Sequence, residues 1–225
     1  IGAREKQMVR RSRRERFVVG ADGYRHGWVA VRLVGGRLAG VALFASFREL
    51  LEENGAAAAI GVDIPIGLVD RGERAADREA RERLRPRGST VFPTPPGPVL
   101  LEADYQRAAV MHQRLVGKGL SKQAHGLRKK IFEVRKTSRT PCIVEVHPEL
   151  SFKAMANGIV AEPKKSWAGQ VARRRLLGGA GIEIPDDIGK AGAAGADDVL
   201  DAAACAWTAW RVACGEAQRL PSTSG

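Results

Sequence analysis

The sequence is poor in cysteine, and its cysteines are not arranged as a framework. Only three of the 225 residues are cysteine, at Cys142, Cys205 and Cys214, and none of them lies in a CxxC pair. An odd number cannot pair completely, which excludes a disulfide scaffold, and the spacing excludes a zinc ribbon. We therefore expect reduced thiols and a cytoplasmic protein.

No stretch of the sequence is suited to crossing a membrane. The longest uncharged run, residues 88–101, contains four prolines and cannot form a spanning helix. Hydrophobic residues make up 44% of the chain and charged residues 28%, as in a globular protein. The length corresponds to one large domain, or to one domain with an appendage.

A phosphate-binding P-loop is also missing. Gly117-Lys118-Gly119 has no glycine at the required earlier position, and Lys164-Lys165-Ser166 lacks the glycine before its lysine. Actin-like sugar kinases are expected to have two strands that end in Asp-Gly, and this sequence has one. The missing P-loop and the single Asp-Gly strand end both argue against nucleotide-dependent phosphotransfer.

Positive charge is in excess and is concentrated in two segments. The net charge is +12, of which residues 1–16 contribute +5 and residues 114–139 contribute +8, so the rest sums to −1. This distribution indicates a polyanionic partner, nucleic acid first, although a solvated basic surface explains it equally well. We interpret residues 1–16 as a flexible basic arm. The oligomeric state stays open, a homodimer included.

The order of the expected elements predicts a single α/β domain over residues 17–221. Strand patterns occur at 17–22, 28–34, 38–44, 57–64 and 142–147. The first three form an antiparallel meander, and parallel strands follow, flanked by helices. Helical and loop patterns between about 71 and 140 form an insertion. A loop is expected over 176–195, and a last helix, rich in small residues, over 197–214.

Three of these strands deliver a carboxylate near their C-terminal end: Asp22, Asp63 and Glu145. Because side chains alternate along a strand, Asp22 shares a face with Gly20, and Asp63 shares one with Gly61. These glycines leave room for a close approach. Since ligand sites of α/β sheets lie beyond the C-terminal strand ends, the three acids are candidates for one site.

The last helix adds Asp198 and Asp201, which lie three residues apart on one helical face. A cluster of carboxylates needs cations, and hard oxygen ligands select Mg²⁺ or Mn²⁺. Two such ions can clamp the attacking and leaving oxygens in phosphodiester hydrolysis. Taken singly, each acid has a plainer interpretation, as a turn residue at the strand ends or as a charge at a helix N-terminus for Asp198.

A second candidate surface is a basic helix face that follows Ser121. The apolar residues of this segment fall on one side of the expected helix and the lysines on the other. We expect the basic side to bind nucleic-acid phosphates through Lys122, Lys129, Lys136 and the neighbouring Arg128. A merely solvated face is the alternative.

Motifs along almost the whole of residues 17–221 resemble the domain-of-unknown-function family 429. They are Val19–Gly23 with Gly27-Trp28, Gly61–Leu68, Ser89–Pro95, Gly119–Ala124, Glu145–Phe152 and Asp197–Ala202. Members of this family are predicted nucleases with an RNase H-like fold. The resemblance therefore implies an RNase H-like sheet and Mg²⁺- or Mn²⁺-dependent hydrolysis of nucleic acid, with DNA and RNA both open.

The spacing of Asp198 and Asp201 also resembles the last catalytic helix of RuvC-type resolvases. This resemblance implies that Asp22 bridges two ions and that Asp63 and Asp201 hold one each, while Asp198 assists. Glu145 and His147 are further catalytic candidates for positioning metal or water, and His147 is as well explained as a structural histidine. The main rival is a non-catalytic nucleic-acid-binding or structural module that keeps the fold, and the complete set of acids argues against it.

Overall fold

The structure is a computed structural model that describes residues 16–137 and 143–222. The expected basic arm, apart from Arg16, and Cys142 lie outside the described residues, while Cys205 and Cys214 are free thiols. The described chain forms two compact units. The first contains the residues up to 63 and those from 137 to 217, and the second contains 64–136 and the residues from 218 on. The expected insertion at 71–140 overlaps most of the second unit.

The first unit is built on a five-stranded mixed sheet in the order β3-β2-β1-β4-β5. The strands are β1 (Phe17–Tyr24), β2 (Gly27–Val34), β3 (Arg37–Phe44), β4 (Ile60–Val62) and β5 (Ile143–Glu145). The first three pair antiparallel, and β4 and β5 are added parallel to β1. The sequence-based prediction of an α/β protein with a meander followed by parallel strands is confirmed, although β4 and β5 are shorter than expected.

Local sequence explains the meander. Gly35 and Gly36 both have positive φ, 59° and 82°, so the two-residue turn between β2 and β3 takes the backbone twist that a tight hairpin requires. The register shifts once, between Arg32 and Leu33. Because a tight turn joins β2 to β3, these two strands are direct neighbours in the sheet, and β1 lies next to β2.

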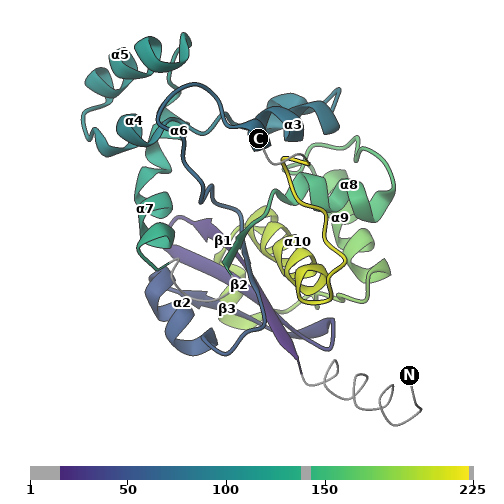
Figure 1. Cartoon of the computed structure of the whole chain (residues 1–225). Helices are drawn as coiled ribbons and strands as arrows, with labels where there is room; N and C mark the ends of the chain where they lie inside the picture. The colour runs from purple at the N-terminus through teal and green to yellow at the C-terminus, as the bar shows by residue number, and fades with distance from the viewer. Residues whose placement is uncertain (1–15, 138–142, 223–225) are drawn as a thin grey trace, which may run out of the picture. The chain divides into compact units, whose positions relative to one another are not determined.

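Helices cover both faces of the sheet (Figure 1). On one face lies α10 (Ala196–Ala213), which shares a buried hydrophobic cluster with Val18, Val29 and other strand residues. On the other face, α2 (Phe47–Asn54) places Phe47 with its ring centroid 4.9 Å from that of Trp28. The hydroxyl of Ser46 accepts a hydrogen bond from the Glu49 amide, so Ser46 is the N-cap of α2.

Two more helices pack against α10 in the first unit: α8 (Pro148–Ala156) and α9 (Trp167–Gly179). The loop expected over 176–195 is therefore wrong at its start. Ser166 caps α9, and Leu177 is fully buried in the same hydrophobic cluster as α10, so burial extends the helix into a glycine-rich stretch. Beyond it, a 3₁₀ turn, η2, spans Gly189–Ala193.

The second unit is helical in its described part. Its elements are α3 (Ala75–Arg83), η1 (Gly88–Thr90), α4 (Gly97–Leu101), α5 (Tyr105–Val116), α6 (Lys122–Gly126) and α7 (Arg128–Thr137). The single helix expected after Ser121 is thus two helices, separated at Leu127. A small apolar cluster that includes Val99, Ala108 and Leu120 holds α4, α5 and α6 together.

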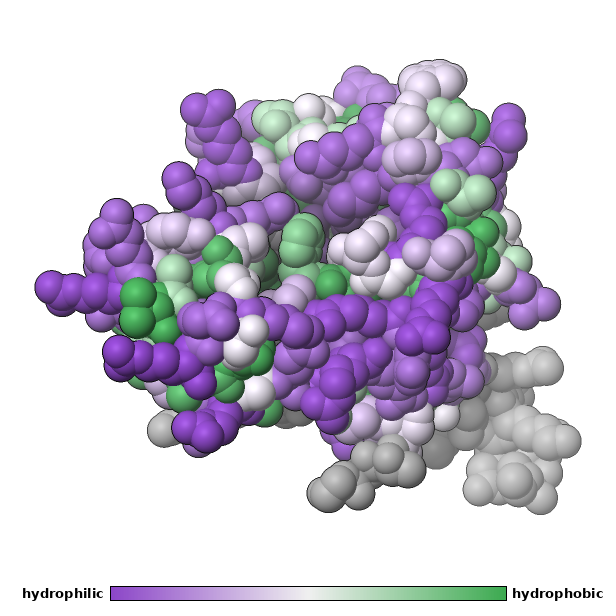
Figure 2. Space-filling view, turned by 90° about the horizontal axis from the view of Figure 1, so that it is seen from above, coloured by the Kyte–Doolittle hydropathy of each residue, from purple (hydrophilic) through white to green (hydrophobic). Residues whose placement is uncertain are grey.

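None of the helices in the described ranges combines the length and the hydrophobicity needed to cross a bilayer. The face of the molecule in Figure 2 is mainly hydrophilic, and hydrophobic side chains occur on it in small separate groups.

Candidate metal centre

The close approach that the strand glycines permit is made by helix α10. Gly20 and Gly61 are paired residues of β1 and β4, and α10 lies directly on both. A Cβ atom on Gly20 would stand 1.9 Å from the backbone nitrogen of Ala206, and one on Gly61 would stand 2.4 Å from the carbonyl oxygen of Cys205. Only glycine fits at these positions, so the helix can settle on the sheet backbone itself.

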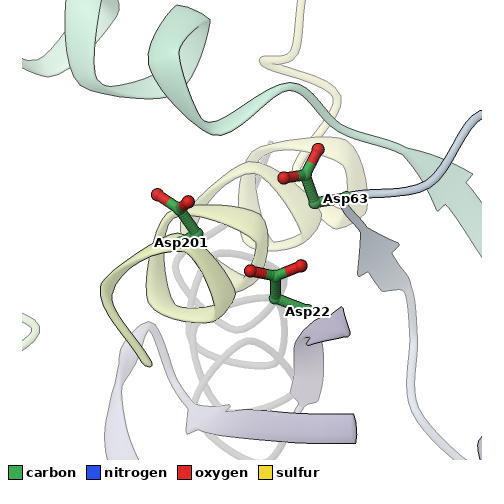
Figure 3. Close-up of side chains that lie close together, drawn as sticks. All are labelled: Asp22, Asp63 and Asp201. Carbon is green, nitrogen blue, oxygen red and sulfur yellow. The ribbon is translucent and has the colours of Figure 1, made fainter. Parts of the chain in front are cut away.

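This packing brings three carboxylates together. Asp22 and Asp63 each follow a paired glycine by two residues, so their side chains lie side by side on the α10 face of the sheet. Asp201 precedes the contact residues of α10 by about one helical turn. Figure 3 shows the three side chains close together, Asp22 and Asp63 on the strands and Asp201 on α10, and one oxygen from each lies within 4.8 Å of the others. The group can hold a metal ion.

The cluster is short of positive charge. Asp22 and Asp201 are 9% and 1% exposed, and Asp63 is half-buried. Burial, and then the charge of Asp201, raises the pKa of Asp63 to about 8. Burial and the neighbouring carboxylates of Asp63 and Asp201 raise the pKa of Asp22 well above its usual range. Both shifts mean that ionising the cluster is unfavourable until a cation neutralises it.

A lysine supplies part of that charge. The ammonium of Lys164 donates a hydrogen bond of 2.5 Å to Oδ2 of Asp201. Burial alone would lower the pKa of Lys164, but the carboxylates of Asp201, Asp63 and Asp22 outweigh it and raise the pKa. For Asp201 the balance is the reverse, because burial raises its pKa to about 6 against the lowering effect of Lys164.

One oxygen of the cluster has no partner in the described part of the chain. Oδ1 of Asp201 is buried and accepts no hydrogen bond from the described residues. A buried carboxylate oxygen without a donor is costly, and a bound cation would satisfy it. Carboxylate oxygens are the ligands that Mg²⁺ and Mn²⁺ prefer, so the donor set fits such an ion.

Asp198 lies beside the group of three rather than in it. Its carboxyl is half-buried and accepts a hydrogen bond from the backbone of Gly195. A negative charge is favourable at this place, because it lies at the N-terminus of α10. Burial and then Asp197 raise its pKa, and its charge in turn helps to raise the pKa of Asp22. Asp198 therefore affects the cluster through its negative charge and is not one of the three grouped residues.

Glu145 and His147 are not members of the group of three. The charge of Glu145 nevertheless adds to the rise in the pKa of Asp63, after burial and the charge of Asp201. Glu145 pairs with Val62, whereas Gly61 and Asp63 alternate with Val62 along the strand. By this register, the Glu145 side chain lies on the sheet face opposite to α10, where it is exposed. His147 is half-buried at the N-cap of α8.

The basic candidates lie in the helices of the second unit. Lys122 is exposed on α6, Lys129 and Lys136 are exposed on α7, and Arg128 is half-buried. His125 falls on the same side in the sequence pattern but is buried, and its Nε2 bonds to the carbonyl oxygen of Glu102. Its ring also lies edge-on to that of Tyr105, with the centroids 5.7 Å apart, so packing against α5 explains its burial.

Sequence reasoning missed Lys164 as a partner of the acids. Its only local signal was the Lys164-Lys165-Ser166 triplet, which resembles nothing at a metal site. It also missed the buried ion pair in which Arg173 donates to both oxygens of Glu149, at 2.7 and 2.9 Å. Glu149 is thereby engaged in holding α8 to α9.

Comparison with known proteins gives one family. The model of the family described as protein of unknown function DUF429 matches residues 20–224, which includes all three aspartates of the cluster. No curated protein and no solved structure matches the sequence. Because the match extends over nearly the whole chain, this protein belongs to the DUF429 family.

Proposed function

We propose that this protein is a Mg²⁺- or Mn²⁺-dependent hydrolase that cleaves phosphodiester bonds in nucleic acid. The observation that carries the proposal is the convergence of Asp22, Asp63 and Asp201, with ligand oxygens within 4.8 Å of one another. The uncompensated charge of these carboxylates and the unpartnered Oδ1 of Asp201 support a cation as the missing component.

The sheet supports an RNase H-like fold for this site. A three-stranded antiparallel meander is followed by two parallel strands, and the acids come from β1, from the end of β4 and from the last helix. This is the arrangement that the resemblance in the sequence implies. The fold alone would not carry the function, which rests on the residues of the site.

Each acid of the site would have its own role in binding metal. Asp22 would bridge two ions, while Asp63 and Asp201 would hold one each and Asp198 would add negative potential. A bound pair of ions stabilises the charge that develops on the attacking and leaving oxygens of an in-line displacement. The close packing of α10 against Gly20 and Gly61 would hold the three carboxylates in place.

Nucleic acid is the proposed substrate because of the basic segment. Residues 114–139 carry +8, and Lys122, Lys129 and Lys136 are exposed in the second unit. Exposed lysines of this kind meet phosphates without sequence preference. DNA and RNA are both compatible with such contacts.

One observation favours the rival function, a module that binds nucleic acid without cleaving it. The Lys164 ammonium already occupies Oδ2 of Asp201, so the chain neutralises part of its own acidic cluster. If that ion pair only stabilised the fold, the acids would need no metal. The two proposals therefore differ in metal binding and in turnover.

The test is a cleavage assay on labelled single-stranded DNA, RNA, a hybrid duplex and a branched junction, with Mg²⁺ or Mn²⁺. We expect the wild-type chain to cleave at least one substrate, and Asp22→Asn, Asp63→Asn and Asp201→Asn to abolish cleavage. Glu53→Gln is the matched control, because it removes an exposed acid of α2, on the sheet face opposite to α10, and should leave cleavage intact. Binding of nucleic acid with no cleavage, and with no stabilisation by Mn²⁺, would establish the rival function instead.

A further inference from the structure

Trp167 is a large apolar side chain left in solvent. It is 81% exposed, whereas Trp28 in the sheet is fully buried. An indole ring offers a flat apolar face on which the ring of a ligand can stack.

The position of Trp167 in the chain places it near the metal centre. It follows Lys164, which bonds to Asp201, by three residues, so the two Cα atoms lie within about 11 Å. The intervening turn is held rigidly, because the amide and hydroxyl of Ser166 both donate to the carbonyl of Pro163, at 2.9 and 2.8 Å. Gly169 has no room for a Cβ against that same carbonyl.

Two lysines precede Trp167 closely along the chain, and both act on the acids. Lys165 is exposed, and its ammonium, like that of Lys164, opposes the rise that burial and Asp197 cause in the pKa of Asp198. An exposed aromatic residue thus follows, by two and three residues, two lysines whose charges act on the aspartates. Such a combination matches a strand that offers bases and phosphates in alternation.

We propose that Lys164–Trp167 binds unpaired nucleotides of the substrate strand, with Trp167 stacked on a base and Lys165 at a phosphate. The inference rests on the proposed function for the identity of the ligand, and it adds the substrate class. Every base has a face that can stack on an aromatic ring, which makes the contact tolerant of sequence. In an intact duplex these faces are covered by neighbouring base pairs, so the site selects single-stranded or locally unpaired nucleic acid.

The test measures binding by fluorescence anisotropy without divalent ions, so that neither cleavage nor metal occupancy enters. The ligands are a short labelled single strand of mixed sequence and the same strand annealed to its complement. Trp167→Ala should weaken single-strand binding on the order of tenfold or more, while Trp167→Phe should retain most of it. Duplex binding should change little in either variant.

Two further variants make the test more specific. Lys165→Ala should reduce the dependence of log K on log salt by about 0.7 for a single strand, the value for one phosphate contact. Leu101→Ala is the control for loss of exposed apolar surface, because Leu101 is 71% exposed on α4, and it should bind like the wild type. Equal melting temperatures will show that all variants are folded.

Unchanged single-strand affinity in Trp167→Ala would overturn the inference, and a surface that docks another protein would give this result. Equal loss of single-strand and duplex binding would also overturn it, because stacking would then not be the contact. Failure of the proposed function would give a different experimental result. It would appear as absent metal binding and absent cleavage in the wild-type chain, whatever the affinity of Trp167→Ala.

Discussion

Lys164 and Asp201 share a hydrogen bond of 2.5 Å that satisfies only one oxygen of the carboxylate. Oδ2 of Asp201 accepts the ammonium, whereas Oδ1 is buried without a partner among the described residues. The lysine is therefore a built-in cation that stabilises the acidic cluster without completing it. A metal ion at the same carboxylate would meet the repulsion of this charge.

That relationship makes a prediction about metal affinity. Lys164→Met keeps most of the side-chain volume and removes the charge, so Mn²⁺ should bind more tightly, on the order of tenfold. The melting temperature without metal should fall, because the buried Asp201 carboxylate loses its partner. Isothermal titration calorimetry and thermal melting give the two values.

Lys165→Met is the matched control for Lys164. Lys165 is the next residue and is exposed, so its loss should change Mn²⁺ affinity much less. Weaker Mn²⁺ binding in Lys164→Met would show that the lysine orders the site for metal rather than competing with it.

The glycines under α10 give a prediction about stability. Gly20→Ala places a methyl group 1.9 Å from the backbone of Ala206, and a backbone cannot move aside as a flexible side chain can. We expect a loss of about 3 kcal/mol or more in the free energy of unfolding. Gly40→Ala on β3 is the control, since a Cβ there meets nothing within 4 Å. Denaturant unfolding measures the free energy of unfolding of both variants. Equal values would contradict the close packing of α10 against Gly20.

Much of the centre could be predicted because its causes are local. The alternation of side chains in β1 and β4 places Asp22 with Gly20 and Asp63 with Gly61, and both patterns are visible in the sequence. The three-residue spacing of Asp198 and Asp201 likewise predicts a shared helical face. The strand register and the helix position then bring Asp22, Asp63 and Asp201 together as expected.

The parts that could not be predicted depend on tertiary contacts. Lys164 lies 37 residues before Asp201, and no periodicity links them. The face on which Glu145 lies follows from the pairing of β5 with β4, which the sequence of β5 does not encode. Helix α9 depends on the burial of Leu177 among residues of other elements, because its own glycines disfavour a helix.

The exposed lysines of the second unit give a prediction about binding. Replacing Lys122, Lys129 and Lys136 with alanine should weaken nucleic-acid binding and lower the salt dependence by up to about 3 units if each makes one phosphate contact. Stability should hardly change, because the three side chains are exposed. A salt titration of affinity tests this, and an unchanged slope would leave these lysines as a solvated face.

The raised pKa values of the cluster predict how stability depends on pH. Asp63 has a pKa of about 8 in the folded chain, above its ordinary value of 3.8, so its protonated form is the one that folding favours. The stability that this group contributes is complete below about pH 4 and is lost as the pH rises through 8. Asp22 shifts in the same direction, and Asp201, with a pKa of about 6, adds to the loss at lower pH.

In a chelating buffer, the free energy of unfolding should therefore decline between about pH 5 and pH 8.5. Asp63→Asn should flatten the decline above about pH 6, because its amide does not ionise. Saturating Mn²⁺ should also reverse the decline, since the ion binds the ionised carboxylates of the folded chain and stabilises it by mass action. Denaturant unfolding at a series of pH values, with and without Mn²⁺, measures both effects. A stability that stays level in the chelating buffer, with the same profile in Asp63→Asn, would mean that the buried carboxylates are already neutralised by the chain itself.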